Sequence, residues 1–167
     1  NRNGLRHGPP ALYADLRFAP DCLTAMSGKK NKPASVLFVC TMNAVRSPIA
    51  SALLRHLRGK DIYVQSAGVE AGALDPMAVE VMAEIGIPLA HNPRRFEDLQ
   101  DDCFDLVVAL SHEAETHALE WSRTVSASVE YWITADPTMA EGTAEQRRAA
   151  YRAVRDTLKR QIAARFA

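Results

Sequence analysis

The chain has 167 residues, of which 47% are hydrophobic and 24% are charged, which suits one globular domain with a substantial core. Its 20 lysines and arginines balance its 20 aspartates and glutamates, so the composition gives no electrostatic basis for binding nucleic acid or an anionic membrane. No apolar run approaches the roughly 20 residues of a membrane-spanning helix.

The three cysteines, Cys22, Cys40 and Cys103, are widely and irregularly spaced. An odd number at such spacing indicates neither a disulfide framework nor a zinc ribbon, and we expect a reducing, cytoplasmic setting. The five histidines show no metal-ligand spacing. We therefore predict that the protein uses neither a metal nor another cofactor.

Residues 1–34 differ in composition from the rest of the chain. Basic residues outnumber acidic ones there, little periodic pattern is present, and four prolines occur: Pro9, Pro10, Pro20 and Pro33. We interpret residues 1–34 as an N-terminal extension, either an arm packed on the domain or a tail. Residues 35–167 form the predicted domain.

Strand and helix patterns alternate from Ser35 onward. Ser35–Cys40 is a short apolar run rich in β-branched residues, as expected of a strand buried on both faces. A helix over residues 48–57 and a strand over residues 61–66 follow. The next predicted helix has Asp75 as its N-cap, a proline at its first position, and Gly86 at its end.

The second half of the chain continues this alternation. We predict a strand over residues 104–110, a helix over residues 112–121 and a strand over residues 129–134. The last helix begins at a capping box formed by Thr143 and Gln146. Its predicted buried stripe consists of Tyr151, Val154, Leu158, Ile162 and Phe166.

This order of elements predicts an α/β fold, a single doubly wound domain in which a four-stranded parallel sheet has helices on both faces. Ligands of such sheets bind beyond the carboxyl ends of the strands. Cys40 ends the first predicted strand at that edge. The loop after the first strand is therefore the first place to look for a functional site.

The loop after this strand has the composition of a phosphate-binding loop. A cysteine and an arginine flank it, and a helix follows at once: Cys40-Thr41-Met42-Asn43-Ala44-Val45-Arg46-Ser47-Pro48. A short loop leading into a helix turns successive backbone N–H groups inward around an anion. We predict that residues 41–46 surround the phosphate, with Arg46 binding two of its oxygens.

Cys40 is the predicted nucleophile. A helix N-terminus can lower the pKa of a thiol from about 8.5 to roughly 3.5–7.5, which favours the reactive thiolate. A cysteine at a strand end is otherwise more often a buried structural residue. The arginine and the helix start so close to Cys40 favour the catalytic interpretation.

These residues resemble a known family. The pattern Val39-Cys40-x-x-Asn43-x-x-Arg46-Ser47-Pro48 is similar to the signature loop of the low-molecular-weight protein-tyrosine phosphatases, whose fold and loop the thioredoxin-linked arsenate reductases share. Further segments follow in the family's order, so the resemblance covers about Ser35 to Phe166: Ser66-Ala67-Gly68, Gly86-Ile87-Pro88 with His91, and Asp136-Pro137.

The resemblance implies a phosphatase that hydrolyses phosphomonoesters through a cysteinyl-phosphate intermediate. Its substrate would be a phosphorylated protein or a small aryl phosphate, and inorganic phosphate would be released. The family's loop is supported by an asparagine that bonds two serines and a histidine. The matching residues here are Asn43, Ser47, Ser66 and His91, and the Ser47 hydroxyl would donate to the Cys40 thiolate.

The general acid is sought among two Asp-Pro pairs, because hydrolysis needs a proton for the leaving oxygen. Asp75 is already explained as a helix cap. Asp136 ends no predicted helix and opens none directly, and it lies just beyond the last strand. The family's acid also precedes a proline in that loop, so we predict that Asp136 is the general acid.

The chain also departs from the phosphatase pattern. Met42 replaces a glycine, and Val45 replaces a second cysteine that protects the nucleophile. Aromatic residues that would grip a tyrosine ring are missing after Asp136-Pro137. We expect Tyr131 and Trp132 to lie in the core or on a sheet face. Ring stacking should then contribute little, and phosphotyrosine peptides should not be strongly preferred.

Arsenate reductase is the alternative function, because the C-terminal stretch resembles that branch. Its two further cysteines are replaced by Ser111 and Ala118, and Cys103 lies on the wrong side of the third strand. Such an enzyme would need an external thiol. A phosphate-binding module without catalysis is a second alternative, although binding alone requires neither a thiolate nor an acid.

Overall fold

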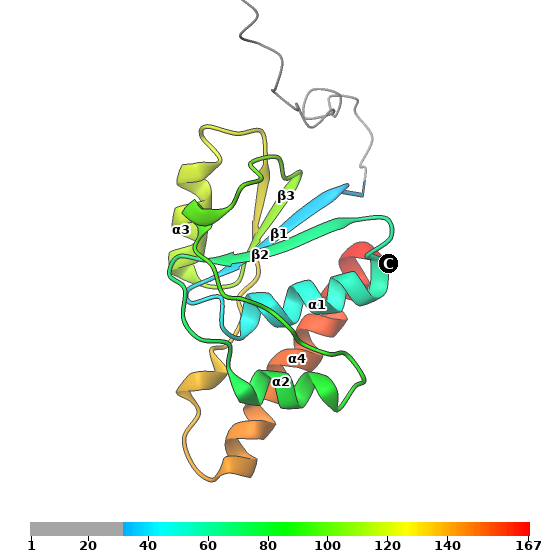
Figure 1. The fold of residues 1–167 in the computed structure, drawn as a ribbon, viewed down its shortest axis with the longest axis vertical. Coiled ribbons are helices and arrows are strands. Elements are labelled where there is room, and N and C mark those ends of the chain that lie inside the picture. The colour runs from blue at the N-terminus through cyan, green and yellow to red at the C-terminus, as the bar shows by residue number, and fades with distance from the viewer. Residues whose placement is uncertain (1–31) are drawn as a thin grey trace, which may run out of the picture. The chain divides into compact units, whose positions relative to one another are not determined.

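The computed structural model describes residues 32–167, so the predicted extension over residues 1–34 lies almost wholly outside the described residues. Within them, four strands form one parallel sheet in the order β2-β1-β3-β4 (Figure 1). The strands are β1 (Ser35–Cys40), β2 (Tyr63–Gly68), β3 (Leu106–Ala109) and β4 (Ser128–Tyr131). This confirms the predicted fold class.

Helices lie on both faces of the sheet (Figure 1). One face packs against α1 (Arg46–Arg58), α2 (Pro76–Ala83) and α4 (Ala144–Phe166), and the other against α3 (His112–Trp121). Two short 3-10 helices, η1 (Phe96–Asp98) and η2 (Pro137–Met139), complete the elements. No helix in residues 32–167 is long and apolar enough to span a membrane.

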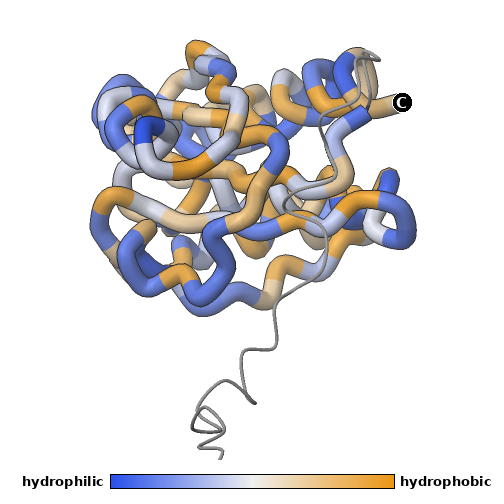
Figure 2. Tube along the Cα trace, turned by 90° about the horizontal axis from the view of Figure 1, so that it is seen from above, coloured by the Kyte–Doolittle hydropathy of each residue, from blue (hydrophilic) through white to orange (hydrophobic). Residues whose placement is uncertain are grey.

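The core has two layers because successive residues of β1 face opposite sides of the sheet. Val36 and Phe38 join the layer under α1 and α4, whereas Leu37 and Val39 join the layer under α3. The predicted stripe of α4 is buried at all five positions. Figure 2 shows several hydrophilic stretches of the chain at the periphery of the fold.

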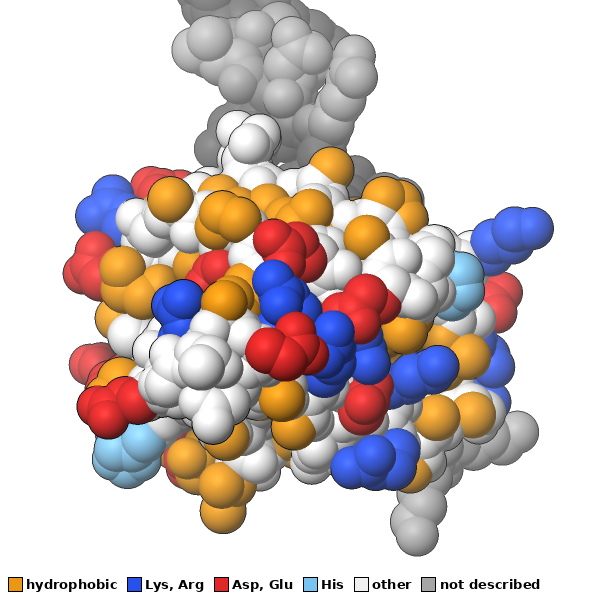
Figure 3. Space-filling model, turned by 90° about the horizontal axis from the view of Figure 1, so that it is seen from below, with side chains coloured by type: hydrophobic (Ala, Val, Ile, Leu, Met, Phe, Trp, Pro, Cys, Tyr) orange, Lys and Arg blue, Asp and Glu red, His pale blue; other side chains and the backbone are white. Residues whose placement is uncertain are grey.

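The two predicted N-terminal helix caps are present, whereas α2 ends at Ala83, before the predicted end at Gly86. The Asp75 carboxylate accepts the Met77 N–H at 2.9 Å, and both bonds of the Thr143–Gln146 capping box form. Ion pairs between α2 and α4 add to the contact, including Arg148–Glu80 and Arg152–Glu84. Acidic and basic side chains are interleaved on the lower face of the molecule (Figure 3).

Several strand boundaries differ from the prediction, and two of these differences affect the site. β2 continues to Gly68 because Ala67 and Gly68 still pair with Val39 and Cys40. β4 ends at Tyr131 rather than residue 134, because its pairing partner β3 ends at Ala109. The chain beyond Tyr131 therefore lies at the carboxyl edge of the sheet instead of inside a strand.

Candidate active site

The loop between β1 and α1 turns its carbonyl groups outward. Backbone N–H groups of residues 69–75 and of α1 donate to five of its carbonyl oxygens: those of Cys40, Thr41, Met42, Ala44 and Val45. A planar trans peptide points the next N–H the opposite way. Within residues 32–167, no acceptor is found for the N–H groups of Met42, Asn43 and Val45. Such unpaired, inward-facing N–H groups can form a nest for an anion.

Gly68 allows β2 to approach this loop closely. A Cβ atom at Gly68 would lie 2.8 Å from the Asn43 nitrogen and 2.2 Å from the Glu70 oxygen. Any larger residue would push the segment after β2 off the loop. That segment supplies several of the donors that hold the loop carbonyls outward, so the glycine preserves the shape of the nest.

Cys40 lies at the base of the loop with 2% of its surface exposed. Its Sγ atom is 2.9 Å from the Ser47 hydroxyl oxygen. That oxygen accepts a hydrogen bond from Asn43 Nδ2 at 2.8 Å, and its single proton has two acceptors in reach, the Cys40 sulfur and, farther away, the Ala67 carbonyl oxygen at 3.3 Å. A hydroxyl donated to sulfur stabilises the thiolate, both as nucleophile and as leaving group.

Asn43 satisfies all four hydrogen bonds that a side-chain amide can make. Its Nδ2 donates to Ser47 Oγ at 2.8 Å and to Ser66 Oγ at 3.1 Å. Its Oδ1 accepts from His91 Nε2 at 2.6 Å and from the Arg94 backbone N–H at 3.0 Å. Asn43 has a φ of 53°, a left-handed conformation that asparagine tolerates better than most residues.

His91 must carry its proton on Nε2, because Asn43 Oδ1 can only accept. Burial, followed by the charges of Arg94 and Arg55, lowers the pKa of His91 from 6.5 to about 4. The ring is therefore neutral at physiological pH and acts as a fixed donor. Arg94 reinforces the same contact, since its Nε donates to the Ser66 carbonyl at 3.1 Å. No sequence pattern pointed to Arg94.

This pKa predicts a specific pH dependence of stability. Unfolded His91 takes up a proton near pH 6.5, whereas folded His91 takes it up only near pH 4, so stability falls as pH drops between these values. Because the ring is only partly buried, we expect a loss of about 1–2 kcal/mol in the free energy of unfolding between pH 7 and pH 4.5. Denaturant unfolding of the wild type and His91→Gln, which keeps an N–H donor without titrating, measures it. An identical pH dependence of both proteins would contradict the prediction.

Arg46 begins α1, and backbone carbonyls from two other parts of the sheet edge hold its guanidinium group. Nη1 donates to the carbonyl oxygens of Leu110 at 3.2 Å and Thr134 at 3.4 Å, while Nη2 lies 3.7 Å from Asp136 Oδ2. The loops after β3 and β4 therefore orient the guanidinium across the carboxyl edge. Two of its nitrogens remain able to bind an oxyanion in the cavity.

Asp136 lies in the loop after β4, and its oxygens differ in their contacts. Oδ1 accepts the Thr138 N–H at 3.0 Å and the Thr138 hydroxyl at 2.7 Å, whereas Oδ2 faces Arg46. The expectation that Asp136 opens no helix was wrong, because it caps η2. This cap fixes the carboxylate and leaves Oδ2 turned toward Arg46.

All three predicted catalytic side chains, Cys40, Arg46 and Asp136, line one cavity of about 400 Å³. Thr41, Met42, Ala44 and Val45 also line it, as expected for the phosphate loop. Asn43 does not line the cavity, because its amide points away into the supporting hydrogen bonds.

Tyr131 also lines this cavity, contrary to the expectation that it would be a core or sheet-face residue. β4 ends at Tyr131, so the residue lies at the carboxyl edge and not within the strand. Trp132 packs on the core as expected, with its ring 6.1 Å from that of Phe38. The pocket therefore has one aromatic side chain at its wall.

The region after β3 adds residues that sequence patterns did not single out as a group. Ser111, His112 and Glu113 line the cavity at the start of α3. The Thr41 hydroxyl lies 3.0 Å from Ser111 Oγ and 2.9 Å from Glu113 Oε2. Their position in the sequence could have pointed to them, since all three follow the carboxyl end of a parallel strand.

The positions that carry shuttle cysteines in the arsenate reductase branch are occupied differently here. Ser111 caps α3, accepting the Ala114 N–H at 3.3 Å, and Ala118 is a buried residue of the same helix. The carbonyl of Cys103 accepts from the hydroxyl of Ser35, the first residue of β1. Cys103 therefore lies at the opposite edge of the sheet from Cys40.

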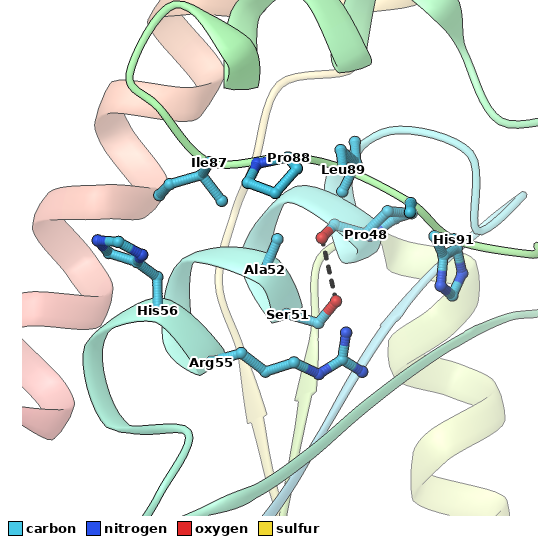
Figure 4. A pocket seen from close by; sticks show the side chains of 10 residues that line it. Pro48, Ser51, Ala52, Arg55, His56, Ile87, Pro88, Leu89 and His91 are labelled. Atoms are coloured by element: carbon cyan, nitrogen blue, oxygen red, sulfur yellow. Dashed lines mark hydrogen bonds between the residues drawn. The ribbon is translucent and has the colours of Figure 1, made fainter.

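A second cavity, of about 250 Å³, lies between α1 and the segment after α2 (Figure 4). Ile87, Pro88 and Leu89 form one wall, and Arg55 and His91 lie at its edge. Cys40 does not reach it. No cluster of histidine, cysteine and carboxylate side chains in the described part of the chain has the geometry of a metal site.

Comparison with known proteins identifies the relationship. The family model "Low molecular weight phosphotyrosine protein phosphatase" matches residues 35–166. The chain belongs to this family. An arsenate reductase of Halalkalibacterium halodurans is 36% identical over 132 residues, covering 76% of this chain and 91% of the relative. The family membership confirms the resemblance read from the loop.

Solved structures of this family with different activities are similar to the chain. An arsenate reductase in the phosphate-binding state has a TM-score of 0.66 at 28% identity, covering 80% of this chain and 98% of the other. The YwlE arginine phosphatase from Geobacillus stearothermophilus also has a TM-score of 0.66, at 29% identity, covering 78% and 89%. The family is therefore established, while its members differ in the reaction they perform.

Proposed function

We propose that this protein is a phosphatase that hydrolyses phosphomonoesters, with a phosphorylated protein side chain or an aryl phosphate as substrate. The observation that carries the proposal is the convergence of Cys40, Arg46 and Asp136 on one cavity whose floor is the inward-facing nest. A nucleophile, an anion-binding fork and a carboxylic acid are the groups that this reaction requires.

The first step would transfer the phosphoryl group to Cys40. The thiolate attacks phosphorus while the nest and Arg46 bind the equatorial oxygens. As the bond from phosphorus to the leaving oxygen breaks, Asp136 Oδ2 donates its proton to that oxygen. The products of this step are a free alcohol or phenol and a cysteinyl-phosphate.

The second step would release inorganic phosphate. The Asp136 carboxylate now accepts a proton from a water molecule, whose oxygen attacks phosphorus. The bond between sulfur and phosphorus breaks, and Cys40 leaves as a thiolate. The Ser47 hydroxyl at 2.9 Å stabilises that thiolate, which lowers the barrier to this step.

The apolar surface around the cavity supports an organic phosphate as substrate. Two exposed hydrophobic side chains, Met42 and Tyr131, line the cavity. Two more, Ile133 and Met139, are next in the chain to the lining residues Thr134 and Thr138. Ile133 and Met139 are 82% and 76% exposed. Arsenate offers nothing for such a surface to bind, whereas the residues around a phosphorylated side chain do.

Arsenate reduction with an external thiol is the second candidate, and the similarity to arsenate reductases favours it. The same nest would bind arsenate, and Cys40 would attack arsenic. Because Ser111 and Ala118 replace the shuttle cysteines, a small thiol or another protein would have to resolve the adduct. The external thiol supplies the electrons and is oxidised to a disulfide.

A substrate panel tests the two candidates together. The protein would be assayed with an aryl phosphate, with phosphotyrosine, phosphoserine and phosphoarginine peptides, and with arsenate plus external thiol. The phosphoarginine arm is included because of the similarity to YwlE. Hydrolysis of an aryl phosphate or phosphotyrosine peptide supports the proposal. Turnover of arsenate alone would replace it with the second candidate.

Tyr131 gives a finer prediction about specificity. Stacking against one aromatic ring contributes about 0.5–1.5 kcal/mol, so Tyr131→Ala should lower kcat/KM for a phosphotyrosine peptide by about twofold to tenfold. Tyr131→Phe keeps the ring and should retain the wild-type value. Equal losses in both variants would show that the hydroxyl, and not ring stacking, contributes to binding.

A further inference from the structure

The Glu113 carboxylate is held by the residue that follows Cys40. It lies in the first turn of α3 and lines the active-site cavity. Its Oε2 accepts a hydrogen bond from the Thr41 hydroxyl at 2.9 Å, and Thr41 directly follows Cys40 in the chain. A negative charge therefore stands at the wall of a cavity whose floor is built to bind an anion.

The hydrogen bonds around Thr41 orient this carboxylate. A carboxylate only accepts, so the single Thr41 hydroxyl proton points to Glu113. Ser111 Oγ lies 3.0 Å from the same Thr41 hydroxyl as a second acceptor, and it also accepts the Ala114 N–H. The Thr41 hydroxyl therefore links the Glu113 side chain to the loop after Cys40 and fixes it at the cavity.

A helix terminus by itself does not explain this arrangement. Acidic residues are favoured in the first turn of any helix because of the helix dipole. Glu115 lies in the same turn of α3 and satisfies that preference without lining the cavity. The tether to Thr41 and the position at the cavity wall distinguish Glu113 from its neighbour.

We propose that Glu113 is a specificity-determining residue that selects substrates carrying a basic side chain next to the phosphorylated residue. Its charge repels the phosphate dianion of any substrate. A neighbouring arginine or lysine offsets this repulsion by pairing with Glu113. The inference rests on the proposed phosphatase function, since it concerns a phosphorylated peptide.

The test uses two phosphotyrosine peptides that differ only in the residues on either side of the phosphotyrosine, arginine in one and glutamine in the other. Their dissociation constants are measured by fluorescence anisotropy in a Cys40→Ser background, where no turnover is needed. We expect the arginine peptide to bind about two- to fivefold more tightly, the range for exposed ion pairs. Adding Glu113→Gln should remove the preference, and Glu115→Gln should retain it. The preference should also shrink in 1 M salt, where the Debye length is about 3 Å.

The outcomes separate the inference from the proposed function. Equal binding of the two peptides, the same preference with and without Glu113, or no binding of either peptide would overturn the inference. Arginine-dependent binding that Glu113→Gln abolishes supports it, even where the wild type hydrolyses neither peptide. In that case only the phosphatase function fails. With active wild type, the preference should appear in KM rather than kcat.

Discussion

Replacing Cys40 by serine should reduce turnover to less than about a thousandth of the wild-type rate, a loss of about 4 kcal/mol in transition-state stabilisation. A serine hydroxyl stays protonated where a thiol ionises, and Ser47 is placed to stabilise sulfur at 2.9 Å. Binding of inorganic phosphate should persist, because the nest and Arg46 are unchanged. Steady-state kinetics with an aryl phosphate and calorimetric phosphate binding measure the two quantities.

The two measurements have to diverge for this interpretation of Cys40 to hold. Loss of both turnover and phosphate binding would indicate a damaged loop, which a lower melting temperature would also reveal. Residual turnover above about a thousandth of wild type in Cys40→Ser would exclude Cys40 as the nucleophile.

The second large effect concerns Asp136. Asp136→Ala should slow hydrolysis of an aryl phosphate by about 10²–10⁴, the usual contribution of a general acid. The loss should be greatest for substrates with a poor leaving group, because these depend most on protonation of the leaving oxygen. A series of aryl phosphates of graded leaving-group pKa, assayed with wild type and variant, measures this dependence.

Two further variants separate chemistry from structure. Asp136→Asn keeps an oxygen for the Thr138 N–H and hydroxyl, so it should preserve η2 yet slow the reaction as Asp136→Ala does. Asp75→Ala removes the cap of α2 and the partner of the Tyr151 hydroxyl at 2.5 Å. It should cost about 1–3 kcal/mol of stability without changing the leaving-group dependence. Exchanged phenotypes would mean that Asp75 is the acid.

Burial and the Asp75 carboxylate hold the pKa of Tyr151 above its ordinary value, so the phenol stays protonated and donates to Asp75. This contact joins α4 to the residue that caps α2. The N–H of Asp75 in turn donates to the Ala44 carbonyl of the phosphate loop at 3.2 Å. Asp75 therefore has a structural role beyond the cap that its position before Pro76 predicted.

Much of this protein could be predicted from local patterns. The apolar run of β1, the caps at Asp75 and Thr143 and the stripe of α4 all depend on neighbouring residues, whose spacing is fixed by strand and helix geometry. Alternation of strands and helices then restricts the sheet to a parallel one. The phosphate loop was recognisable for the same reason, since its residues are contiguous.

The tertiary structure alone decided the contacts between distant segments. The position of Tyr131 at the cavity depends on where β3 stops pairing with β4, and no pattern within β4 marks that point. The carbonyls of Leu110 and Thr134 orient Arg46, and the backbone N–H of Arg94 gives Asn43 its fourth partner. Backbone groups are the same in every residue, so the sequence cannot mark which of them will serve as partners. Only the packing of strands and loops brings these groups to one edge of the sheet.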